Sequence, residues 1–294
     1  MPQTAADLLD LLDIETIDVN LFRGRQPDTS RQRVFGGQVA AQAFLAGART
    51  VAPDRLAHSL HAYFLRPGDP AVPIVYDVQR LRDGRAFSTR RVVARQHGRD
   101  IFYVTINFQD EEPGFDHQAG APAVVPPEES LRLVDIIRSR SEGGVDVEAW
   151  EREWSALDVR YVGVSGMGLP VDPARPAQAR IWVRVDGEIP DDQALQRAVF
   201  IYASDLTLLG ATLVPHGLTL NSPGVQPASL DHTVWFHRPF RADRWWLYDQ
   251  ESPSASGARG LSLAGIYTED GTRAATVAQE GLIRPVAGPN VGGP

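Results

Sequence analysis

Residues 64–77, FLRPGDPAVPIVYD, and residues 236–249, FHRPFRADRWWLYD, share one spacing at an offset of 172 positions. Each stretch begins with the pattern F-x-R-P, and ten residues after the proline each ends in Tyr-Asp. The glycines Gly98 and Gly271 continue the alignment at an offset of 173, so the register holds over about 35 residues. Such self-similarity indicates an internal duplication. The sequence therefore predicts two copies of one structural unit.

Each copy begins with a segment whose apolar residues recur at helical spacing. The first is RVFGGQVAAQAFLAGARTV at 33–51, and the second is PDDQALQRAVFIYASDLTLL at 190–209. Asp191 and Asp192 follow Pro190 and are placed to cap the start of the second helix. We expect one long helix in each unit.

Segments with the composition of β-strands follow each helix, and the turns between them carry RDG, HG and EDG, which favour hairpins. These segments are 57–66, 72–82, 86–96 and 100–109 in the first unit, and 229–238, 244–251, 258–268 and 272–284 in the second. A helix followed by consecutive antiparallel strands predicts a sheet that wraps around the helix. The expected fold class is α+β, with two tandem units of this kind.

The composition between the two units predicts where each one ends. The stretch EEPGFDHQAGAPAVVPPEES is rich in proline, glycine and acids, which is typical of a linker. A short helical piece, LRLVDIIRSR, follows it. The expected division is an N-terminal unit at 1–115, a linker at 116–154, a C-terminal unit at 155–285 and a tail at 286–294.

The overall composition excludes several functional classes. The net charge of −8 gives no general attraction to nucleic acid or to an anionic membrane. The chain has no cysteine, which excludes disulfides, thiolate metal sites and a cysteine nucleophile. No apolar run approaches the roughly 20 residues of a membrane-spanning helix. The N-terminus lacks the basic start of a secretory signal. We therefore expect a cytoplasmic protein without a membrane span.

One cluster of arginines in the first unit consists of Arg80, Arg82, Arg85, Arg90 and Arg91. A solvated strand face is the favoured interpretation, and a local site for a phosphorylated ligand is the alternative.

Asp205 interrupts the apolar side of the second predicted helix, where an acid is costly unless it has a partner. The duplication supplies a candidate partner. When Gly271 is aligned with Gly98, Gln279 falls opposite Ile106, on the strand face that should pack on the helix. Two polar groups on buried faces of one unit predict a small shared polar pocket.

Several long strings of the sequence resemble the acyl-CoA thioesterase II family. They are RVFGGQVAAQA, HSLHAYFLRPGD, YDVQRLRDGRAFSTRRV, YASDLTLL, LDHTVWFHRPF, ESPSASGARG and TVAQEGLIRP, and they cover roughly residues 15–115 and 155–285. The resemblance implies a double hot-dog fold and hydrolysis of fatty acyl-CoA, with no cofactor, metal or covalent intermediate. It also implies a catalytic trio, whose matching positions here are Asp205, Ser229 and Gln279.

These three residue types suit thioester hydrolysis. A partly buried carboxylate has a raised pKa and can orient a water molecule and take its proton. Gln279 and Ser229 can hold the same water, and a backbone N–H near a helix start can stabilise the oxyanion. Taken alone, Asp205 is more often a salt-bridge partner than a catalyst, and Ser229 is more often an ordinary strand residue. Gln279 alone is compatible with a backbone contact at a sheet edge.

Further candidates are weaker. Gly37 and Gln38, within GGQ at 36–38, are expected to approach the substrate, with helix–sheet packing as the alternative. His58 is expected to support substrate binding. The histidines His58, His61, His232 and His237 lack the three converging ligands of a zinc site, so no metal is expected.

Two other functions remain open at this point. A non-catalytic acyl-CoA or fatty-acid binding protein would bind without turnover, although it would have no reason to keep a buried acid. A hydratase would add water to an enoyl-CoA and would need an Asp–His pair at the helix entry. Because such sheets commonly pair edge to edge, we also expect a homo-oligomer, either a dimer or a tetramer of double hot-dogs.

Overall fold

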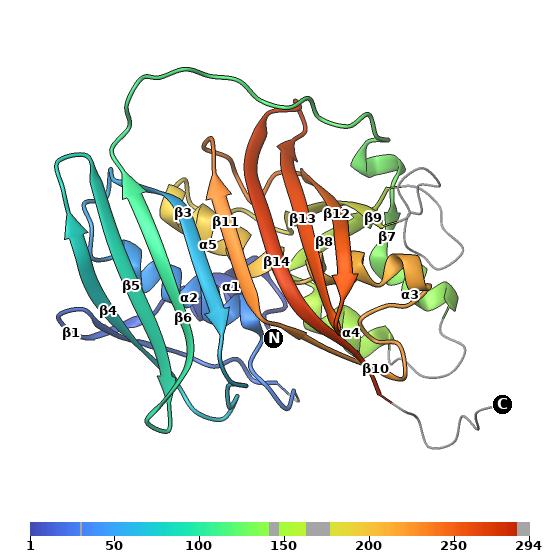
Figure 1. The fold of residues 1–294 in the computed structure, drawn as a ribbon, viewed down its shortest axis with the longest axis horizontal. Helices are drawn as coiled ribbons and strands as arrows, with labels where there is room; N and C mark the ends of the chain where they lie inside the picture. Colours follow the sequence, from blue (N-terminus) through green and yellow to red (C-terminus); the bar gives the residue numbers. More distant parts are fainter. Residues whose placement is uncertain (30, 141–146, 163–176, 287–294) are drawn as a thin grey trace.

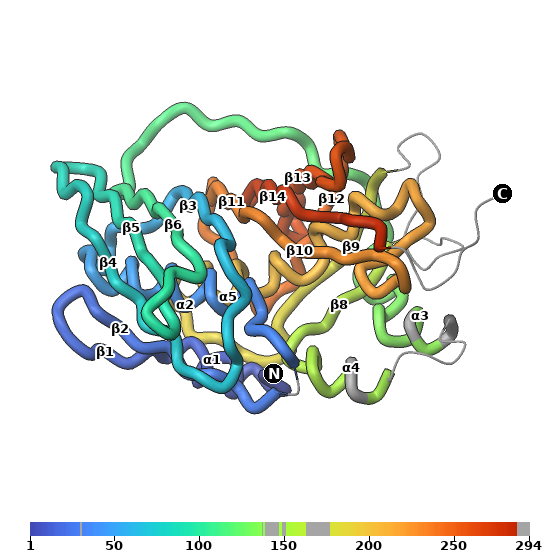
Figure 2. Tube along the Cα trace, turned by 60° about the horizontal axis from the view of Figure 1, so that its bottom comes forward, coloured from blue at the N-terminus to red at the C-terminus, as the bar shows by residue number. Residues whose placement is uncertain are grey.

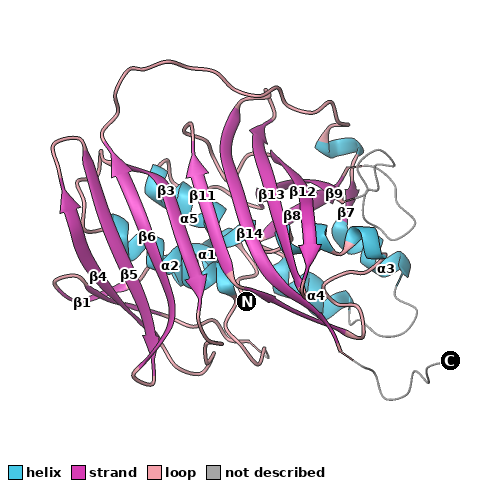
Figure 3. Cartoon of the chain, in the orientation of Figure 1, coloured by secondary structure: helices cyan, strands magenta, loops and turns pink. Residues whose placement is uncertain are grey.

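A computed structural model describes the protein except for residues 30, 141–146, 163–176 and 287–294. Its strands join in one antiparallel sheet that extends through both units, and the long helices lie behind it in Figures 1 and 3. Apart from Val286, the predicted tail falls outside the described residues.

Each unit contains two strands that precede one long helix and four main strands that follow it, and the second unit has one additional short strand. The first of the four main strands pairs with the last instead of with the next. The first unit contains α1 (Ala5–Leu12), β1 (Glu15–Asp18), β2 (Leu21–Gly24), α2 (Gly36–Ala48), β3 (Leu56–Phe64), β4 (Ile74–Asp83), β5 (Phe87–Gln96) and β6 (Arg99–Gln109). The second contains β8 (Leu157–Tyr161), β9 (Gln178–Val185), α5 (Gln193–Ser204), β10 (Val225–Ser229), β11 (Asp231–Phe236), β12 (Trp246–Ser256), β13 (Arg259–Thr268) and β14 (Arg273–Pro285). The leading strands were not predicted because the two copies share no motif there.

The segment between the units contains more regular structure than the predicted linker. It includes the 3-10 turn η1 (Pro127–Glu129), β7 (Leu131–Arg132), α3 (Leu133–Arg140) and α4 (Val147–Trp154). The part after β6 is extended and crosses outside the sheet in both Figures 1 and 2. Gln118 fastens it to the second unit, because its side chain donates to the Gly271 carbonyl and accepts from the Arg273 N–H.

The sheet order shows that a pseudo-two-fold axis relates the units. The strands run β4-β5-β6-β3 and then β11-β14-β13-β12, so the counterparts appear in reverse order. At the junction, His61 of β3 pairs with Thr233 of β11. These two residues are 172 positions apart, which is the repeat offset itself. Each unit therefore meets its own counterpart at the centre of the sheet, and the duplication read from the sequence is confirmed.

The inward strand faces match the predicted alternation. Phe102, Val104, Ile106 and Phe108 of β6 are all buried, as are Ala275, Val277 and Gln279 of β14. Burying each large apolar side chain contributes roughly 1.5–3 kcal/mol to folding. Gln279 thus lies on the face where its counterpart is an isoleucine.

Helices α2 and α5 lie side by side and antiparallel behind the centre of the sheet, with the start of α2 against the end of α5. Their closest approach is at Gly37, because a Cβ atom there would collide with the Tyr202 carbonyl oxygen. Only glycine allows two backbones to come this near.

The second helix is shorter than predicted. It ends at Ser204, and Asp205 is its C-cap with φ −80° and ψ −8°. The apolar residues that suggested a longer helix form the 3-10 turn η2 (Leu208–Thr212) instead. At the other end, Asp192 accepts hydrogen bonds from the Ala194 and Leu195 N–H groups, while Asp191 faces Arg241. Of the two predicted caps, Asp192 is the N-cap of α5.

The stretch Gln193–His216 is apolar and long enough to cross a membrane by composition. This stretch corrects the expectation that no apolar run approaches 20 residues. Of its most apolar part, 72% is buried inside the fold, as is usual for a core helix.

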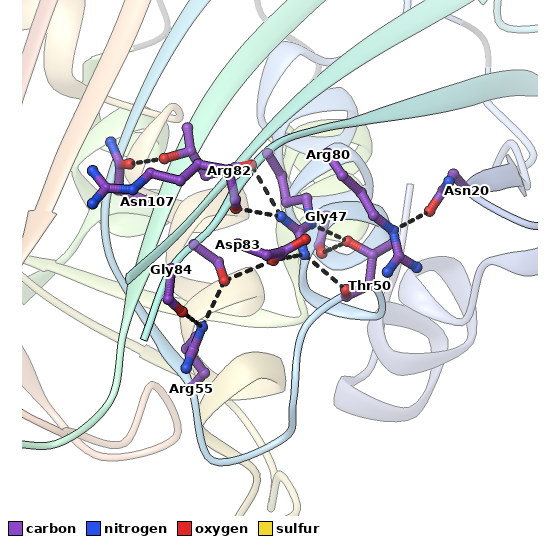
Figure 4. Close-up of polar contacts among 12 residues, drawn as sticks. Asn20, Gly47, Thr50, Arg55, Arg80, Arg82, Asp83, Gly84 and Asn107 are labelled. Carbon is purple, nitrogen blue, oxygen red and sulfur yellow. Dashed lines mark hydrogen bonds and ion pairs between the residues drawn. The ribbon is translucent and has the colours of Figure 1, made fainter. Parts of the chain in front are cut away.

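The arginine cluster is not uniformly on a solvated face. Arg90 is 1% exposed and points inward from β5. Its guanidinium donates to the Thr50 side chain at 2.8 Å and to Asp83 Oδ1 at 2.6 Å. Figure 4 shows Thr50 and Asp83 in this network, with Arg55 beside them. The inward direction follows from the strand alternation, and the polar partners make burial of the charge tolerable.

Candidate active site

Asp205, Ser229 and Gln279 meet in one hydrogen-bonded group. Gln279 Nε2 donates to Asp205 Oδ1 at 2.6 Å and to Ser229 Oγ at 3.0 Å. Ser229 Oγ makes a weaker contact with Asp205 Oδ1 at 3.5 Å. The companion that the repeat register predicted for Asp205 is therefore in place.

The sheet brings two of these residues to the same point. Ser229, the last residue of β10, pairs with Gly281 of β14, two positions beyond Gln279. Side chains two apart on a strand share a face. The third residue comes from the end of α5, so the group forms where helix and sheet meet.

The first unit completes the site through the start of α2. The Gly37 backbone N–H donates a hydrogen bond to Asp205. A Cβ atom at Gly36 would lie only 2.7 Å from Asp205 Oδ2. The two glycines let the carboxylate approach the positive end of the helix, where backbone amides favour an anion. The site thus uses residues of both units.

Burial raises the pKa of Asp205 to about 6. The hydrogen bonds from Gln279, Gly37 and Ser229 oppose this rise, but they do not cancel it. The residue retains partial contact with solvent. A carboxylate with this pKa is about ten parts ionised to one part protonated at pH 7 and binds a proton more readily than an ordinary aspartate.

One polar atom of the site has no partner. Gln279 Oε1 is buried and accepts no hydrogen bond from any described residue. A buried amide oxygen without a partner is costly. It is available to a water molecule or to the substrate.

Residues behind Asp205 hold its backbone in place. The Tyr248 hydroxyl donates to the Ser204 carbonyl at 2.9 Å, and Gln250 Nε2 donates to Thr207 Oγ1 at 2.8 Å. Both donors come from β12, and they secure the turn on either side of the aspartate. The Ser204 hydroxyl also lies 2.9 Å from His232 Nε2.

Sequence reasoning missed this supporting layer. Burial lowers the pKa of His232 to about 4, so its ring is neutral at physiological pH. The available signal was its place on β11 among buried residues, since a buried histidine needs a hydrogen-bonding partner.

The chain matches two family models. Residues 25–109 match the acyl-CoA thioesterase N-terminal domain, and residues 174–282 match acyl-CoA thioesterase. Acyl-CoA thioesterase 2 of Haemophilus influenzae is 40% identical over 282 residues, which is 95% of this chain and 97% of that protein. The chain belongs to the acyl-CoA thioesterase II family.

Solved structures agree with this assignment. An acyl-CoA thioesterase II from Mycobacterium marinum is 42% identical, with a TM-score of 0.80 over 95% of this chain and 98% of that one. A hot-dog protein of unknown function from Alicyclobacillus acidocaldarius is 19% identical, with a TM-score of 0.74 over 95% and 98%. The second likeness concerns the fold alone. This thioesterase is a double hot-dog protein and an acyl-CoA thioester hydrolase.

The weaker candidate residues for substrate binding in this thioesterase do not all lie at the site. Gly37 lies at the site, and Gln38 follows it, with its side chain donating to the Arg25 carbonyl and to Gln26 Oε1. His58 is not brought to the trio. Its ring lies edge-on to Phe87, and burial, together with the charge of Arg197, lowers its pKa.

The remaining histidines do not assemble a metal site. His61 stacks against Trp235 at the junction of the units, and His237 Nε2 lies 2.7 Å from Thr276 Oγ1. Within the described ranges, no three histidine or acidic side chains are grouped so that they could hold a metal ion.

Proposed function

We propose that this enzyme hydrolyses medium- and long-chain fatty acyl-CoA thioesters by direct attack of a water molecule that Asp205 activates. The observation that supports this most is the partly buried Asp205 carboxylate, with a pKa of about 6 and a hydrogen bond from Gln279. It is a base of suitable strength, held beside two groups that can position water.

In the proposed reaction, a water molecule lies against Asp205, Ser229 and Gln279. Its oxygen bonds to the carbonyl carbon while Asp205 takes one proton, and the carbonyl electron pair moves to the oxygen. Collapse of the tetrahedral intermediate breaks the carbon–sulfur bond. The proton held by Asp205 passes to the departing sulfur, so the atoms of water end in the acid and the thiol.

The oxyanion donors in this scheme are backbone amides at the start of α2. The helix has no side-chain cap at Phe35, and the Gly37 N–H is used by Asp205. The first N–H groups of a helix have no partner within it. We assign the oxyanion to the amides of Gly36 and Gln38, which flank Gly37 and share the helix dipole.

The two alternatives have less support. A binding protein without turnover does not account for a costly carboxylate of raised pKa, and the family to which the chain belongs is a family of hydrolases. A hydratase needs an Asp–His pair, whereas the nearest histidine, His232, is neutral and hydrogen-bonds Ser204 rather than Asp205.

Thiol release tests the proposal. Wild type and Asp205→Asn are assayed with saturated acyl-CoAs from four to eighteen carbons. The amide keeps the shape but cannot take the proton, so we expect kcat to fall by about 10³-fold, within the usual range for loss of a general base. A matched control is Asp231→Asn, because Asp231 is half-buried and lies two residues after Ser229 but accepts its hydrogen bond from the Glu280 N–H. Equal activity of wild type and Asp205→Asn would refute the role of Asp205.

Chain-length preference, assembly and compartment stay predictions. The thiol-release series measures the first, and light scattering coupled to size exclusion measures whether the chain forms the expected dimer or tetramer. Fractionation of the source cells tests the cytoplasmic location.

A further inference from the structure

The pseudo-two-fold axis that relates the units also relates the two ends of the α2–α5 pair. One end carries the candidate active site. At the other end, the last turn of α2 faces the first turn of α5, and there the molecule has an open pocket of about 1010 Å³. Its lining also includes residues of α1 and β3. This volume is at the upper end of the range for small-molecule sites.

None of the catalytic trio has a like counterpart in this pocket. Ala57 stands at the position of Ser229, and Ile106 stands at the position of Gln279. The helix C-cap is Arg49 instead of Asp205. The pocket therefore lacks the groups that would activate water.

A buried positive charge without a counter-ion lines the pocket instead. Arg197 of α5 is 5% exposed, and its guanidinium donates to the Ala57 carbonyl. Its Nε atom has no partner, and Arg197 forms no ion pair with a carboxylate of the described residues. The face of the Phe236 ring, 5.0 Å away, gives only partial compensation. Burying such a charge without an anion is costly.

The surrounding groups limit the kind of anion. The other arginines of the lining already have partners: Arg49 pairs with Asp13, Arg55 pairs with Asp110, and Arg80 donates to the Asn20 side chain. Acids also line the pocket, among them Asp10 and Asp18. A ligand with several negative charges would meet repulsion there, whereas a single charge needs only Arg197.

The rest of the lining is suited to an alkyl chain. Apolar side chains come from α1, α2, α5 and the inner strand face, including Leu9, Leu12, Phe44, Phe108 and Leu195. We propose that this pocket is a second ligand site, which binds a fatty carboxylate with its head group on Arg197 and its chain along these residues. That the ligand is the enzyme's own product rests on the proposed function, whereas the binding itself does not.

Photolabelling locates the site. Wild type is irradiated with decanoate that carries a diazirine on a chain carbon close to its carboxylate, and the modified peptides are mapped. We expect labels at residues 44–57 and 190–197, in addition to any label near Asp205. Arg197→Met keeps the unbranched stem of the side chain and removes the charge, so labelling of the pocket should fall at least tenfold. Arg99→Met, at an exposed arginine that begins β6, should leave it unchanged.

A second variant guards against misfolding. Ala48→Trp fills the pocket from the end of α2, and circular dichroism checks both variants for folding. Loss of the pocket label in folded Arg197→Met supports the proposal, and its loss in folded Ala48→Trp confirms that the label reports this pocket. Absence of this label in wild type, or equal labelling in wild type and Arg197→Met, overturns it. Asp205→Asn should retain the pocket label, so a wild type that is labelled but releases no thiol refutes only the proposed function.

Discussion

The two ends of the α2–α5 pair are built alike, but the free N–H groups at the two helix starts are bonded by acids from different places. At the candidate active site, the Gly37 N–H of α2 is bonded by Asp205 of the neighbouring helix. At the opposite end, the corresponding N–H groups of α5 are bonded by Asp192, which belongs to the same helix. An acid taken from the partner helix is drawn into the interface and its pKa rises, whereas a local cap stays at the surface. The comparison indicates that the pKa of the acid depends on which helix supplies it.

After Asp205→Asn, the largest expected effect on kcat comes from replacing one residue of the second unit by its counterpart in the first. Gln279→Ile introduces the side chain found at the equivalent position of the first unit, Ile106. Without the amide donor, the water and the carboxylate lose their orientation, so kcat should fall on the order of 100-fold. The pKa of Asp205 should also rise, since Gln279 now lowers it. The measurement is kcat for one acyl-CoA across pH.

Gln226→Ile is the control, because Gln226 is exposed on β10 beside the site strand. The comparison between the units fails if Gln279→Ile and Gln226→Ile have the same kcat.

The ionisation of Asp205 predicts the acid limb of the pH profile. The carboxylate acts as a base only when it is deprotonated, and its pKa is about 6. Values of kcat/KM should therefore be flat above pH 7 and should drop about tenfold for each pH unit below 6. Initial rates between pH 4.5 and 8 test this. A midpoint near pH 4, the ordinary range for aspartate, would contradict the effect of burial.

The close approach of the helices gives a smaller effect. Gly37→Ala would place a methyl group against the Tyr202 carbonyl and push α2 away from Asp205. We expect about a tenfold loss of kcat and a lower melting temperature. The residue at the same position of α5 is already an alanine, Ala194.

Gly114→Ala serves as the control, since a Cβ atom there would meet nothing within 4 Å. If Gly37→Ala matches it in rate and in melting temperature, the close packing has no role in the site.

The smallest expected effect is on stability, and its sign follows from the raised pKa. Above pH 6 the carboxylate is charged in the folded and unfolded states, and the folded state bears the cost of burying it. Below the ordinary value of 3.8 both states are protonated and the cost disappears. Asp205→Asn should therefore stabilise the protein at pH 8, by at most about 3 kcal/mol. Its advantage should vanish near pH 4.

Thermal melts of wild type and Asp205→Asn at both pH values provide the measurement. A difference in melting temperature that is the same at pH 4 and pH 8 would contradict this origin.

The sequence was most informative where the two copies share a pattern. The F-x-R-P and Tyr-Asp spacing predicted the duplication, and the alternation on β6 predicted that Gln279 points inward. It was least informative where the copies differ. Nothing in the apolar run after Ser204 indicated that the helix stops there, because 3-10 turns and helices use similar apolar spacing.

Contacts between distant segments were also out of reach. The use of the Gly37 N–H by Asp205 depends on how two helices cross, and the support from Tyr248 and Gln250 depends on a strand more than 40 residues away. The pocket at the opposite end depends on the same packing. Position in the sequence alone did not distinguish Arg197 from any other helix arginine.

The extended segment after β6 makes assembly of the site independent of protein concentration. Two separate units would have to find each other before an amide of one could meet an acid of the other, and that encounter weakens as concentration falls. The segment that Gln118 fastens to the second unit makes the encounter intramolecular, at an effective concentration in the millimolar range for a short tether. A site assembled in this way persists in a single molecule, however few copies a cell contains.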